Sequence, residues 1–371
     1  MRHYFITGAT GVVGSAFLKR IVNRRETATL LIRADTEALA QERLKKVILK
    51  CGIPALACRQ VRLIRGDLCQ PEMGLDVDGY QHLASTCTHI VHCAGNVQMN
   101  LPMQVARRQT LTMTHNVLEL MSTSKAAKKM EFVSTVGVVG RQSGRLAESW
   151  VTGSRQFRNS YEAAKAEAEE NVHAMVMSGM PITVHRPSMV VGDSRTGETV
   201  SFQVFYHLCE FLSGARSFGI LPKFNGMKLD IIPCDYVAAL LEASSVDGAH
   251  RTAILHSCSG RSGAIELTAL QDRVRRLFNR RGRKLPATHF LPVPLFKLVI
   301  RAIKPLLSSK QRRALGALPY FLSYLEEKQY FANTVTKRFI QSKKIDVPNV
   351  DHYLETILQY YLSMSRKEKS S

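Results

Sequence analysis

The N-terminal part of the chain, up to about residue 260, alternates between two patterns of apolar and polar positions. Short apolar runs bounded by turn residues are typical of buried strands, and these runs are Tyr4–Thr7, Ala28–Ile32, Val61–Arg65, His89–His92, Lys129–Ser134, Ile182–Arg186 and Ala253–His256. Between them, apolar residues three or four positions apart predict amphipathic helices at Val12–Asn23, Thr36–Cys51, Leu111–Ser124 and Ser160–Ser178. Strands that alternate with helices in this way predict an α/β fold built on a doubly wound parallel sheet.

The C-terminal part has a different character. Residues 272–313 hold a single acid, Asp272, and a run of bases: Arg273, Arg275, Arg276, Arg280, Arg281, Arg283, Lys284, Lys297, Arg301, Lys304, Lys310, Arg312 and Arg313. Apolar residues in the same segment recur at near-helical spacing, interrupted by Pro305. Such a helix can cap a domain, which is the interpretation we favour, or lie on an anionic membrane. We therefore expect an NADP-binding part at 1–260, with substrate-part insertions at about 193–235, and a basic, mainly helical substrate or cap region at 261–371.

Composition narrows the class of protein. The 371 residues are 45% hydrophobic and 22% charged, which is ordinary, but the formal net charge is +21. This excess favours acidic partners such as an acidic carrier protein, anionic lipid or a phosphate-rich cofactor, or else forms a solvated face without a partner. The eight cysteines form no C-x-x-C pair, which argues against a disulfide framework or metal site. No signal peptide and no apolar run of roughly 18 residues are visible, so we expect a cytoplasmic protein, at most peripheral to a membrane.

A glycine-rich turn directly follows the first predicted strand. The sequence Gly8-Ala9-Thr10-Gly11-Val12-Val13-Gly14 joins that strand to a helix. The first glycine permits the tight turn, the second lets the backbone approach a pyrophosphate, and the third lets the helix pack on the strand. The helix N-terminus then offers N–H groups and partial positive charge to phosphates. In this context the motif predicts a Rossmann-type dinucleotide site contacted by Gly8, Thr10, Gly11, Val12, Val13 and Gly14.

Residues after the next three strands refine the cofactor. Arg33 follows the second strand, where an acid would select NAD, and its guanidinium suits the 2′-phosphate of NADP. Asp67, followed by Leu68, comes after the third strand and can accept a hydrogen bond from the adenine amine. The small residues Cys93-Ala94-Gly95 come after the fourth strand, where the backbone must pass close to the cofactor. We therefore expect NADPH as the cofactor.

Tyr161 and Lys165 are four residues apart on a predicted helix, a spacing that places the phenol and the ammonium on one face. We expect the ammonium to lower the pKa of the phenol, which is near 10 in free tyrosine, so that Tyr161 can exchange a proton with a carbonyl oxygen. Lys165 can also hold the nicotinamide ribose. Ser134 and Thr135 end the fifth predicted strand, and we expect the Thr135 hydroxyl, rather than that of Ser134, to hold the substrate oxygen.

These motifs, in this order, resemble those of the extended short-chain dehydrogenases/reductases, and within them the thioester-reductase and fatty acyl-CoA reductase branch. The resemblance runs from about Tyr4 to Tyr361. Further fragments that carry it are Leu31-Ile32-Arg33-Ala34, Glu42-Arg43-Leu44, Gly66-Asp67-Leu68, Ser134-Thr135-Val136-Gly137-Val138, Glu169, His185-Arg186-Pro187-Ser188, Gly192-Asp193-Ser194-Arg195-Thr196-Gly197, Ile232-Pro233-Cys234-Asp235-Tyr236-Val237 and Tyr330-Phe331-Ala332-Asn333-Thr334.

The resemblance implies a Rossmann domain with a smaller substrate-binding part, NADPH, and hydride transfer to an acyl group held as a thioester. It implies that Thr135, Tyr161 and Lys165 are catalytic. It also implies that the turn Arg186-Pro187-Ser188 lies beside the nicotinamide, with Pro187 and Ser188 as cofactor contacts. One departure concerns Thr110, which stands where many relatives have an asparagine that supports the active site.

Three functions remain open from the sequence. The first, which we favour, is NADPH-dependent reduction of an acyl-CoA or acyl-carrier protein to an aldehyde and then an alcohol. Because no adenylation or carrier domain is recognised in the chain, we expect another molecule to deliver that acyl group. The second is oxidoreduction of a ketone or alcohol, as in hydroxysteroid- or flavonol-type members of the same superfamily. The third is a non-catalytic dinucleotide-sensing protein. Nucleic acid is not an expected partner, because the basic residues follow no recognised nucleic-acid-binding pattern.

Overall fold

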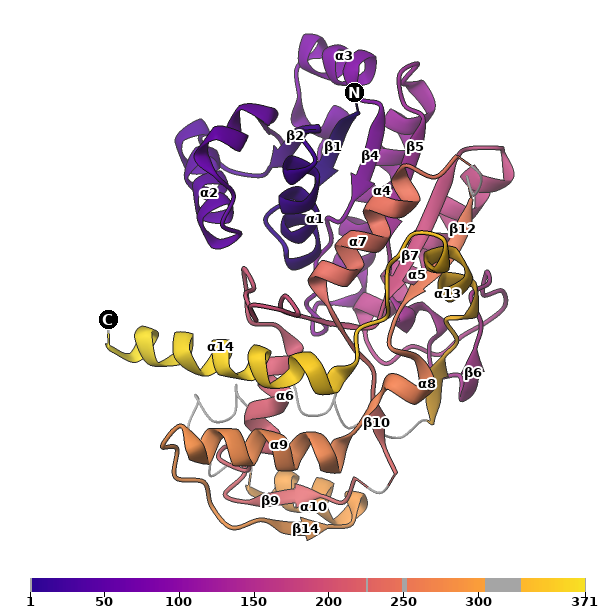
Figure 1. Ribbon diagram of the computed structural model, residues 1–371. Coiled ribbons are helices and arrows are strands. Elements are labelled where there is room, and N and C mark those ends of the chain that lie inside the picture. The colour runs from indigo at the N-terminus through magenta and orange to yellow at the C-terminus, as the bar shows by residue number, and fades with distance from the viewer. Residues whose placement is uncertain (1, 225, 249–251, 304–327, 371) are drawn as a thin grey trace.

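The computed structural model describes residues 2–224, 226–248, 252–303 and 328–370 (Figure 1). Its main feature is a seven-stranded sheet of order β12-β7-β5-β4-β1-β2-β3, in which every pair of neighbours is parallel. The strands are β1 (His3–Thr7), β2 (Thr27–Ile32), β3 (Val61–Arg65), β4 (His89–His92), β5 (Lys129–Val133), β7 (Ile182–Pro187) and β12 (Ala253–Ser257). This sheet confirms the predicted Rossmann-type fold.

Helices cover both faces of the sheet, as a doubly wound fold requires (Figure 1). Helices α1 (Val12–Asn23) and α7 (Cys234–Ser245) pack together on one face, and α4 (Met103–Thr123) and α5 (Ser160–Met177) on the other. Each face has its own core, because successive strand residues point to opposite sides. Tyr4 and Ile6 of β1 thus belong to the core under α1 and α7, whereas Phe5 belongs to the core under α4 and α5. Two further helices flank the sheet: α2 (Glu37–Lys50) and α3 (Val77–Thr86).

The predicted strand ends agree with the structure to within one residue, but one predicted helix is wrong at its start. Helix α4 begins at Met103, directly after Pro102, and not at Leu111. Its first turns are mostly exposed and polar, so they carry no apolar stripe that a periodicity argument could detect. This early start extends α4 along α5, the helix that carries Tyr161 and Lys165.

A second core is built from residues on either side of β12 in the chain. It joins α6 (Val204–Leu212), α9 (Leu267–Arg280), α10 (Val293–Ile303) and α14 (Val350–Ser370), which lie together at the bottom of Figure 1. Val191, shortly after the carboxyl end of β7, is part of this core, so the second body adjoins the carboxyl edge of the sheet. Small two-stranded pairs complete the fold: β6 (Gly144–Leu146) with β15 (Gln329–Phe331), β8 (Met189–Val191) with β11 (Ile231–Pro233), β9 (Ile220–Pro222) with β14 (His289–Leu291), and β10 (Lys228–Leu229) with β13 (Ile265–Glu266).

Helix α10 covers part of the basic segment predicted to cap the domain or meet a membrane. Phe296 is fully buried and packs on Phe211 of α6, with ring centroids 6.1 Å apart, while Leu295 and Leu298 are exposed. The helix therefore packs on the second core. The rest of that prediction, including Lys304, Pro305, Lys310, Arg312 and Arg313, lies outside the described residues. Within the described residues, no helix is both long enough and apolar enough to cross a membrane.

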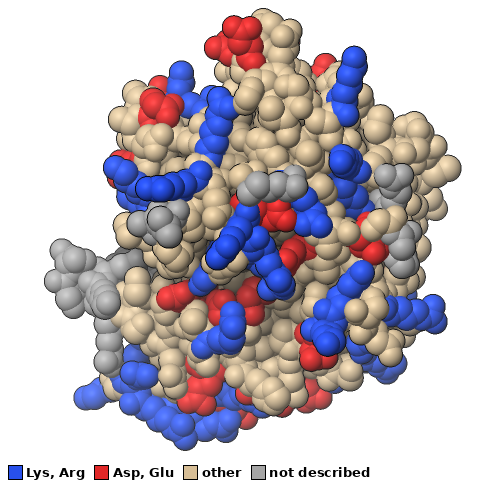
Figure 2. Space-filling view, turned by 45° about the horizontal axis from the view of Figure 1, so that its top comes forward, with Lys and Arg blue, Asp and Glu red and all other residues tan. Residues whose placement is uncertain are grey.

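Charges on the surface are mixed. Figure 2 shows Lys and Arg spread over most of one face, with Asp and Glu standing among them near its centre. Several bases of the 272–313 segment are bonded within the protein. Arg283 pairs with Glu210 at 2.6 Å, and Arg275 donates to the carbonyl of Pro286 at 2.8 Å. Some of the basic side chains thus stabilise the fold through contacts within the protein.

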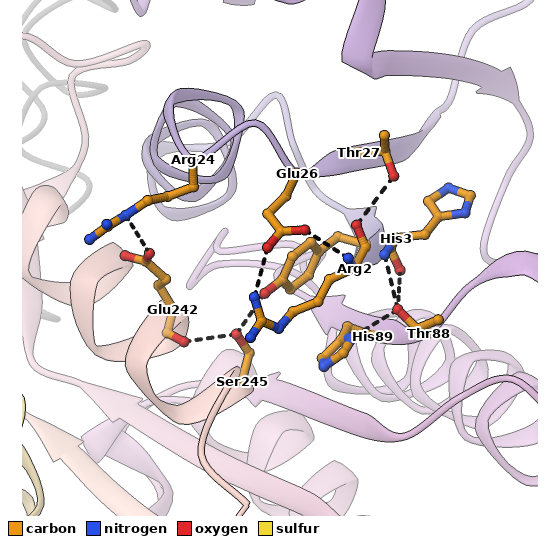
Figure 3. Close-up of polar contacts among 10 residues, drawn as sticks. Arg2, His3, Arg24, Glu26, Thr27, Thr88, His89, Glu242 and Ser245 are labelled. Carbon is orange, nitrogen blue, oxygen red and sulfur yellow. Dashed lines mark hydrogen bonds and ion pairs between the residues drawn. The ribbon is translucent and has the colours of Figure 1, made fainter.

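The amino edge of the sheet is closed by a polar network (Figure 3). Arg2 pairs with Glu26 at 2.7 Å, and the Tyr4 hydroxyl lies 3.0 Å from that of Ser245 on α7. Arg24 pairs with Glu242, also on α7, at 3.0 Å. These contacts tie β1, α1 and α7 together, and they leave the opposite, carboxyl edge for the candidate site.

Candidate active site

The glycine loop has a shape that only glycine permits at two positions. Gly8 has φ of 73°, and a Cβ there would lie 2.6 Å from the amide nitrogen of Ala94. A Cβ on Gly14 would lie 2.3 Å from the carbonyl oxygen of Gly8. The amide of Gly11 donates to that same carbonyl at 2.9 Å, and as N-cap of α1 Gly11 offers no side chain to the helix amides. This close-packed turn at a helix N-terminus fits a pyrophosphate.

The residues predicted at the adenosine end follow β2 and β3, whose ends are adjacent in the sheet. Arg33 is exposed, and its carbonyl accepts a hydrogen bond from Arg43, which anchors the backbone. The Asp67 carboxylate accepts from the amide of Cys69 at 2.9 Å, and this bond holds the turn. Leu68 is buried against the core under α4 and α5.

Asn116 on α4 supports this turn, a role that the sequence reading missed. Its side-chain amide donates to the carbonyls of Leu68 and Gln70 at 2.8 and 2.7 Å. The residue is only 6% exposed and belongs to the buried residues of α4, which are otherwise apolar except for Thr110 and Thr114. A buried asparagine at a core position was the available signal, because a buried amide needs partners.

The loop after β4 lies between the glycine turn and Lys165. The amide of Cys93 donates to the carbonyl of Thr7 at 3.1 Å, which fixes the loop beside β1. A Cβ on Gly95 would lie 3.4 Å from the Lys165 ammonium, so this loop closely approaches a side chain of the helix α5. Burial raises the pKa of the Cys93 thiol to about 12, and the nearby ammonium opposes that shift.

Tyr161 lies in the first turn of α5, which Asn159 caps by accepting from the amide of Glu162 at 2.9 Å. Burial raises the pKa of the phenol to about 12, and a polar contact with the Thr135 side chain acts in the opposite direction. The expected lowering of this pKa by Lys165 is therefore wrong for the structure described. The phenol is a neutral hydrogen-bond donor at physiological pH, which is the form that a proton donor needs.

The Lys165 ammonium contacts strand β5. It donates to the carbonyl of Val133 at 2.9 Å and lies 5.1 Å from the centre of the Phe132 ring. Burial lowers the pKa of Lys165 to about 8, opposed by Cys93 and Glu169. The lysine thus remains mostly protonated at neutral pH. It lies next to the Cys93-Ala94-Gly95 loop.

Thr135 follows β5 and begins a 3-10 turn, η3 (Val136–Val139). Its hydroxyl oxygen accepts from the amide of Gly137 at 3.1 Å, which leaves the hydroxyl hydrogen available to a partner. The preceding Ser134 has a buried hydroxyl with no hydrogen-bond partner among the described residues, and its amide donates to the carbonyl of His185 at 2.7 Å. The structure thus brings Thr135, and not Ser134, to Tyr161.

Helix α5 is fixed to the sheet by a buried ion pair. Arg186 of β7 is fully buried, and its guanidinium donates to both carboxylate oxygens of Glu169 at 2.9 and 2.6 Å. Pro187 and Ser188 follow at the carboxyl end of β7, where the amide of Ser188 donates to the carbonyl of Ser257 at 3.0 Å. Both therefore lie at the same edge as Thr135. Thr110 is buried on α4, which packs along α5.

Glycine turn, strand-end hydroxyl and Tyr–Lys helix meet at one edge of a parallel sheet, and this combination defines an NAD(P)-dependent oxidoreductase of the extended short-chain dehydrogenase/reductase class. Residues 6–241 match the family described as "Male sterility protein", and the chain belongs to this family. Its cofactor is NADPH. Among the described residues, no group of His, Cys, Asp and Glu side chains is arranged to hold a metal ion.

Sequence comparison finds similar proteins that include a reductase and a peptide synthetase. The chain is 28% identical to the nonribosomal peptide synthetase asaC of Aspergillus flavus, over 65% of this chain and 24% of that protein. It is 27% identical to the L-2-aminoadipate reductase large subunit of Candida glabrata, over 66% of this chain and 19% of that protein. The chain thus spans a quarter or less of these relatives.

Solved structures share the whole fold. The terminal R domain of the myxalamid PKS-NRPS pathway matches with a TM-score of 0.81 and 22% identity, covering 98% of this chain and 91% of that domain. An archaeal thiolation-reductase di-domain matches with a TM-score of 0.74 and 18% identity, covering 99% and 76%. At this level of identity the likeness establishes the fold, including the second body at the carboxyl edge.

Proposed function

We propose that this enzyme reduces an acyl thioester, carried by coenzyme A or a carrier protein, to an aldehyde. The observation that carries the proposal is the meeting of Thr135 and Tyr161 at the carboxyl edge, with Lys165 and the glycine turn beside them. The thioester, in preference to a ketone, is supported by the relatives. They include L-2-aminoadipate reductases, nonribosomal peptide synthetases and a reductase joined to a thiolation domain.

The residues that would hold NADPH in this proposal follow the carboxyl ends of β1, β2, β3, β4, β5 and β7 or lie on α5. The glycine turn, with Gly8, Thr10, Gly11, Val12, Val13 and Gly14, would bind the pyrophosphate. Arg33 would bind the 2′-phosphate, Asp67 and Leu68 would contact the adenine, and Cys93-Ala94-Gly95 would contact the cofactor where the loop passes close to it. Lys165 would hold the nicotinamide ribose, and Pro187 and Ser188 would contact the nicotinamide. When bound, the cofactor supplies a hydride.

The protein's own groups act on the thioester oxygen. As the carbonyl carbon accepts the hydride, the π electrons move to the oxygen, where the hydroxyls of Thr135 and Tyr161 donate hydrogen bonds. Tyr161 gives its proton to this oxygen and forms a hemithioacetal. The carbon–sulfur bond then breaks: the hemithioacetal hydroxyl returns its proton to the Tyr161 phenolate and becomes the aldehyde carbonyl, and the sulfur leaves as a thiolate that takes a proton from water. In a second cycle, Thr135 and Tyr161 would hold the aldehyde oxygen in the same way, and Tyr161 would give it the proton that completes an alcohol.

The second core supplies the substrate side in this proposal. It is apolar and adjoins the carboxyl edge through β8, so it can receive an acyl chain whose thioester lies at Tyr161. Residues 1–260 would then hold NADPH, and 261–371, with the insertion at 193–235, would hold the acyl group. Contact of the basic segment with an anionic membrane stays a prediction.

A substrate screen tests the proposal directly. Purified protein with NADPH is given acyl-CoA thioesters of several chain lengths, and NADPH oxidation and free thiol are measured together. One thiol released for each NADPH oxidised at the aldehyde stage, or for each two if an alcohol forms, supports thioester reduction. Oxidation of NADPH by a ketone, without thiol from any thioester, would instead favour the ketone-reductase alternative. No turnover of either class would favour a non-catalytic role.

A further inference from the structure

A shallow hollow of about 500 Å³ lies outside the site described above. Four basic side chains from four different elements line it: Arg145 of β6, Lys228 of β10, Arg261 of α8 (Gly260–Gly263) and Lys337 of α13 (Thr334–Gln341). No acidic residue is among the described residues of its lining, although the surface elsewhere mixes both signs. Convergence of cations from separate parts of the chain, without neutralising carboxylates, is typical of an anion site.

The four cations keep their charges available. In the described part of the chain none of them forms an ion pair. Tyr330 organises two of them: it is the β15 partner of Arg145, and its ring lies 4.9 Å from the Arg261 guanidinium. Lys228 contributes least to the site, because the acidic Glu266 is its cross-strand partner.

The helix end nearby is not what makes the hollow basic. Glu148 already accepts hydrogen bonds from the first amides of α13, those of Val335 and Thr336, at 2.6 and 2.9 Å. A ligand therefore meets side-chain cations and hydroxyls, including that of Ser262, and not a free helix terminus. Guanidinium groups suit phosphate in particular, because their paired N–H groups match two of its oxygens.

The hollow and the catalytic residues share one edge of the sheet. Arg145 lies on β6, which follows Thr135 and η3, and Arg261 follows the carboxyl end of β12. Strand β12 pairs with β7, which pairs with β5, so the end of β12 lies roughly 10 Å along the sheet from the end of β5. A ligand anchored in the hollow can thus extend along the edge to Tyr161.

We propose that the hollow binds a phosphate of the arm that carries the acyl thioester. This inference rests on the proposed function and names the part of the substrate, a phosphate, that the enzyme would bind. Acyl-CoA and acyl-carrier proteins both hold the acyl group on a phosphopantetheine, and coenzyme A adds nucleotide phosphates. With a phosphate on Arg145, Arg261 and Lys337, the pantetheine runs along the carboxyl edge and presents the thioester to Thr135 and Tyr161.

The test compares three thioesters of one acyl chain: acyl-CoA, acyl-4′-phosphopantetheine and acyl-pantetheine, which has no phosphate. The variants are Arg145→Gln, Arg261→Gln and Lys337→Gln, with Lys45→Gln on the exposed face of α2 as the matched control. Each variant should raise KM for the phosphorylated thioesters about 3- to 10-fold, with kcat and the KM for acyl-pantetheine unchanged. An effect on both phosphorylated substrates assigns the pantetheine phosphate, and an effect confined to acyl-CoA assigns the nucleotide phosphates.

Three outcomes would overturn the inference. They are equal effects of the variants on all three thioesters, no effect on either phosphorylated thioester, and a matching rise in KM for NADPH. Calorimetric binding of coenzyme A to the parent and the three variants needs no turnover and separates the two proposals. Affinity that falls in the variants but not in Lys45→Gln supports the hollow even if no thioester is reduced. Thioester reduction with coenzyme A affinity unaltered by the variants would leave the function standing and reject the hollow.

Discussion

Arg186 holds Glu169 through two hydrogen bonds in the interior of the protein, and this pair joins strand β7 to the helix that carries Tyr161 and Lys165. Glu169 lies one helical turn beyond Lys165, and the guanidinium also donates to the carbonyl of Ser149 at 3.0 Å. The orientation of α5 thus depends on a contact between two buried residues that do not touch the substrate in our proposal.

Replacement of Glu169 by Gln should destabilise the protein strongly. It leaves the Arg186 guanidinium buried without its counter-charge, which costs about 3–5 kcal/mol in the free energy of unfolding. Glu167→Gln is the matched control on the same helix, because Glu167 pairs with Arg107 where both are partly exposed, and its loss should cost at most about 1 kcal/mol. Urea unfolding measures both. Similar small losses in the two variants would contradict a supporting role for the buried pair.

Replacement of Arg33 by Ala should change the choice of cofactor. The exposed guanidinium is proposed to meet the 2′-phosphate, so its loss should weaken NADPH binding about 10-fold or more while NADH binding stays the same. Arg62→Ala, at an exposed position of the neighbouring edge strand β3, is the control. Fluorescence titration with both dinucleotides is the measurement, and an equal loss of affinity for NADPH and NADH would argue against this assignment.

Cofactor affinity should depend on pH through Lys165. Because burial lowers the pKa of this lysine from 10.5 to about 8, the ammonium is present below about pH 8 and lost above it. If it holds the nicotinamide ribose, NADPH binding should weaken as the pH rises from 7 to 9. The Lys165→Met variant should bind weakly at both values. A parental enzyme whose NADPH affinity is flat over this range, or a variant that keeps the same pH dependence, would contradict the role.

The Thr135 side chain should contribute to catalysis through the hydrogen bond that its hydroxyl donates and not through the volume that it fills. Thr135→Val removes one donor to the developing oxyanion and should lower kcat about 10²-fold, whereas Thr135→Ser should retain most of the activity. Since the hydroxyl also accepts from Gly137, both variants should be compared for thermal stability. Loss of kcat in proportion to loss of stability, with Ser no better than Val, would indicate a structural role alone.

The sequence predicts the sheet well, because buried parallel strands are continuous apolar runs and each ends close to a turn residue. It also predicts which residues stand at the carboxyl edge, since glycine turn, Thr135 and Tyr161 all follow from local order. It does not predict contacts between distant segments, such as the tether from Asn116 to Leu68. The direction of the Tyr161 pKa was missed for the same reason: spacing reveals the neighbouring ammonium but not the degree of burial.

The sequence also fails to predict which charged side chains come together in the fold. The sequence draws attention to the dense basic run at 272–313, yet Arg283 there is paired with Glu210 and partly buried. The cations of the hollow, Arg145, Arg261 and Lys337, are scattered along the chain and become neighbours only because β6 pairs with β15 and α8 follows β12. Clusters assembled by tertiary structure have no local signature in the sequence.

The proposed proton donor is Tyr161. Single-turnover kinetics of Tyr161→Phe with saturating NADPH and an acyl-CoA test this role most directly. The phenol, with a pKa raised to about 12, is fully protonated at neutral pH, so its removal should slow the burst of thiol release about 10²- to 10⁴-fold. Binding of NADPH should stay at the parental affinity. Thiol release at the parental rate from this variant would contradict the assignment.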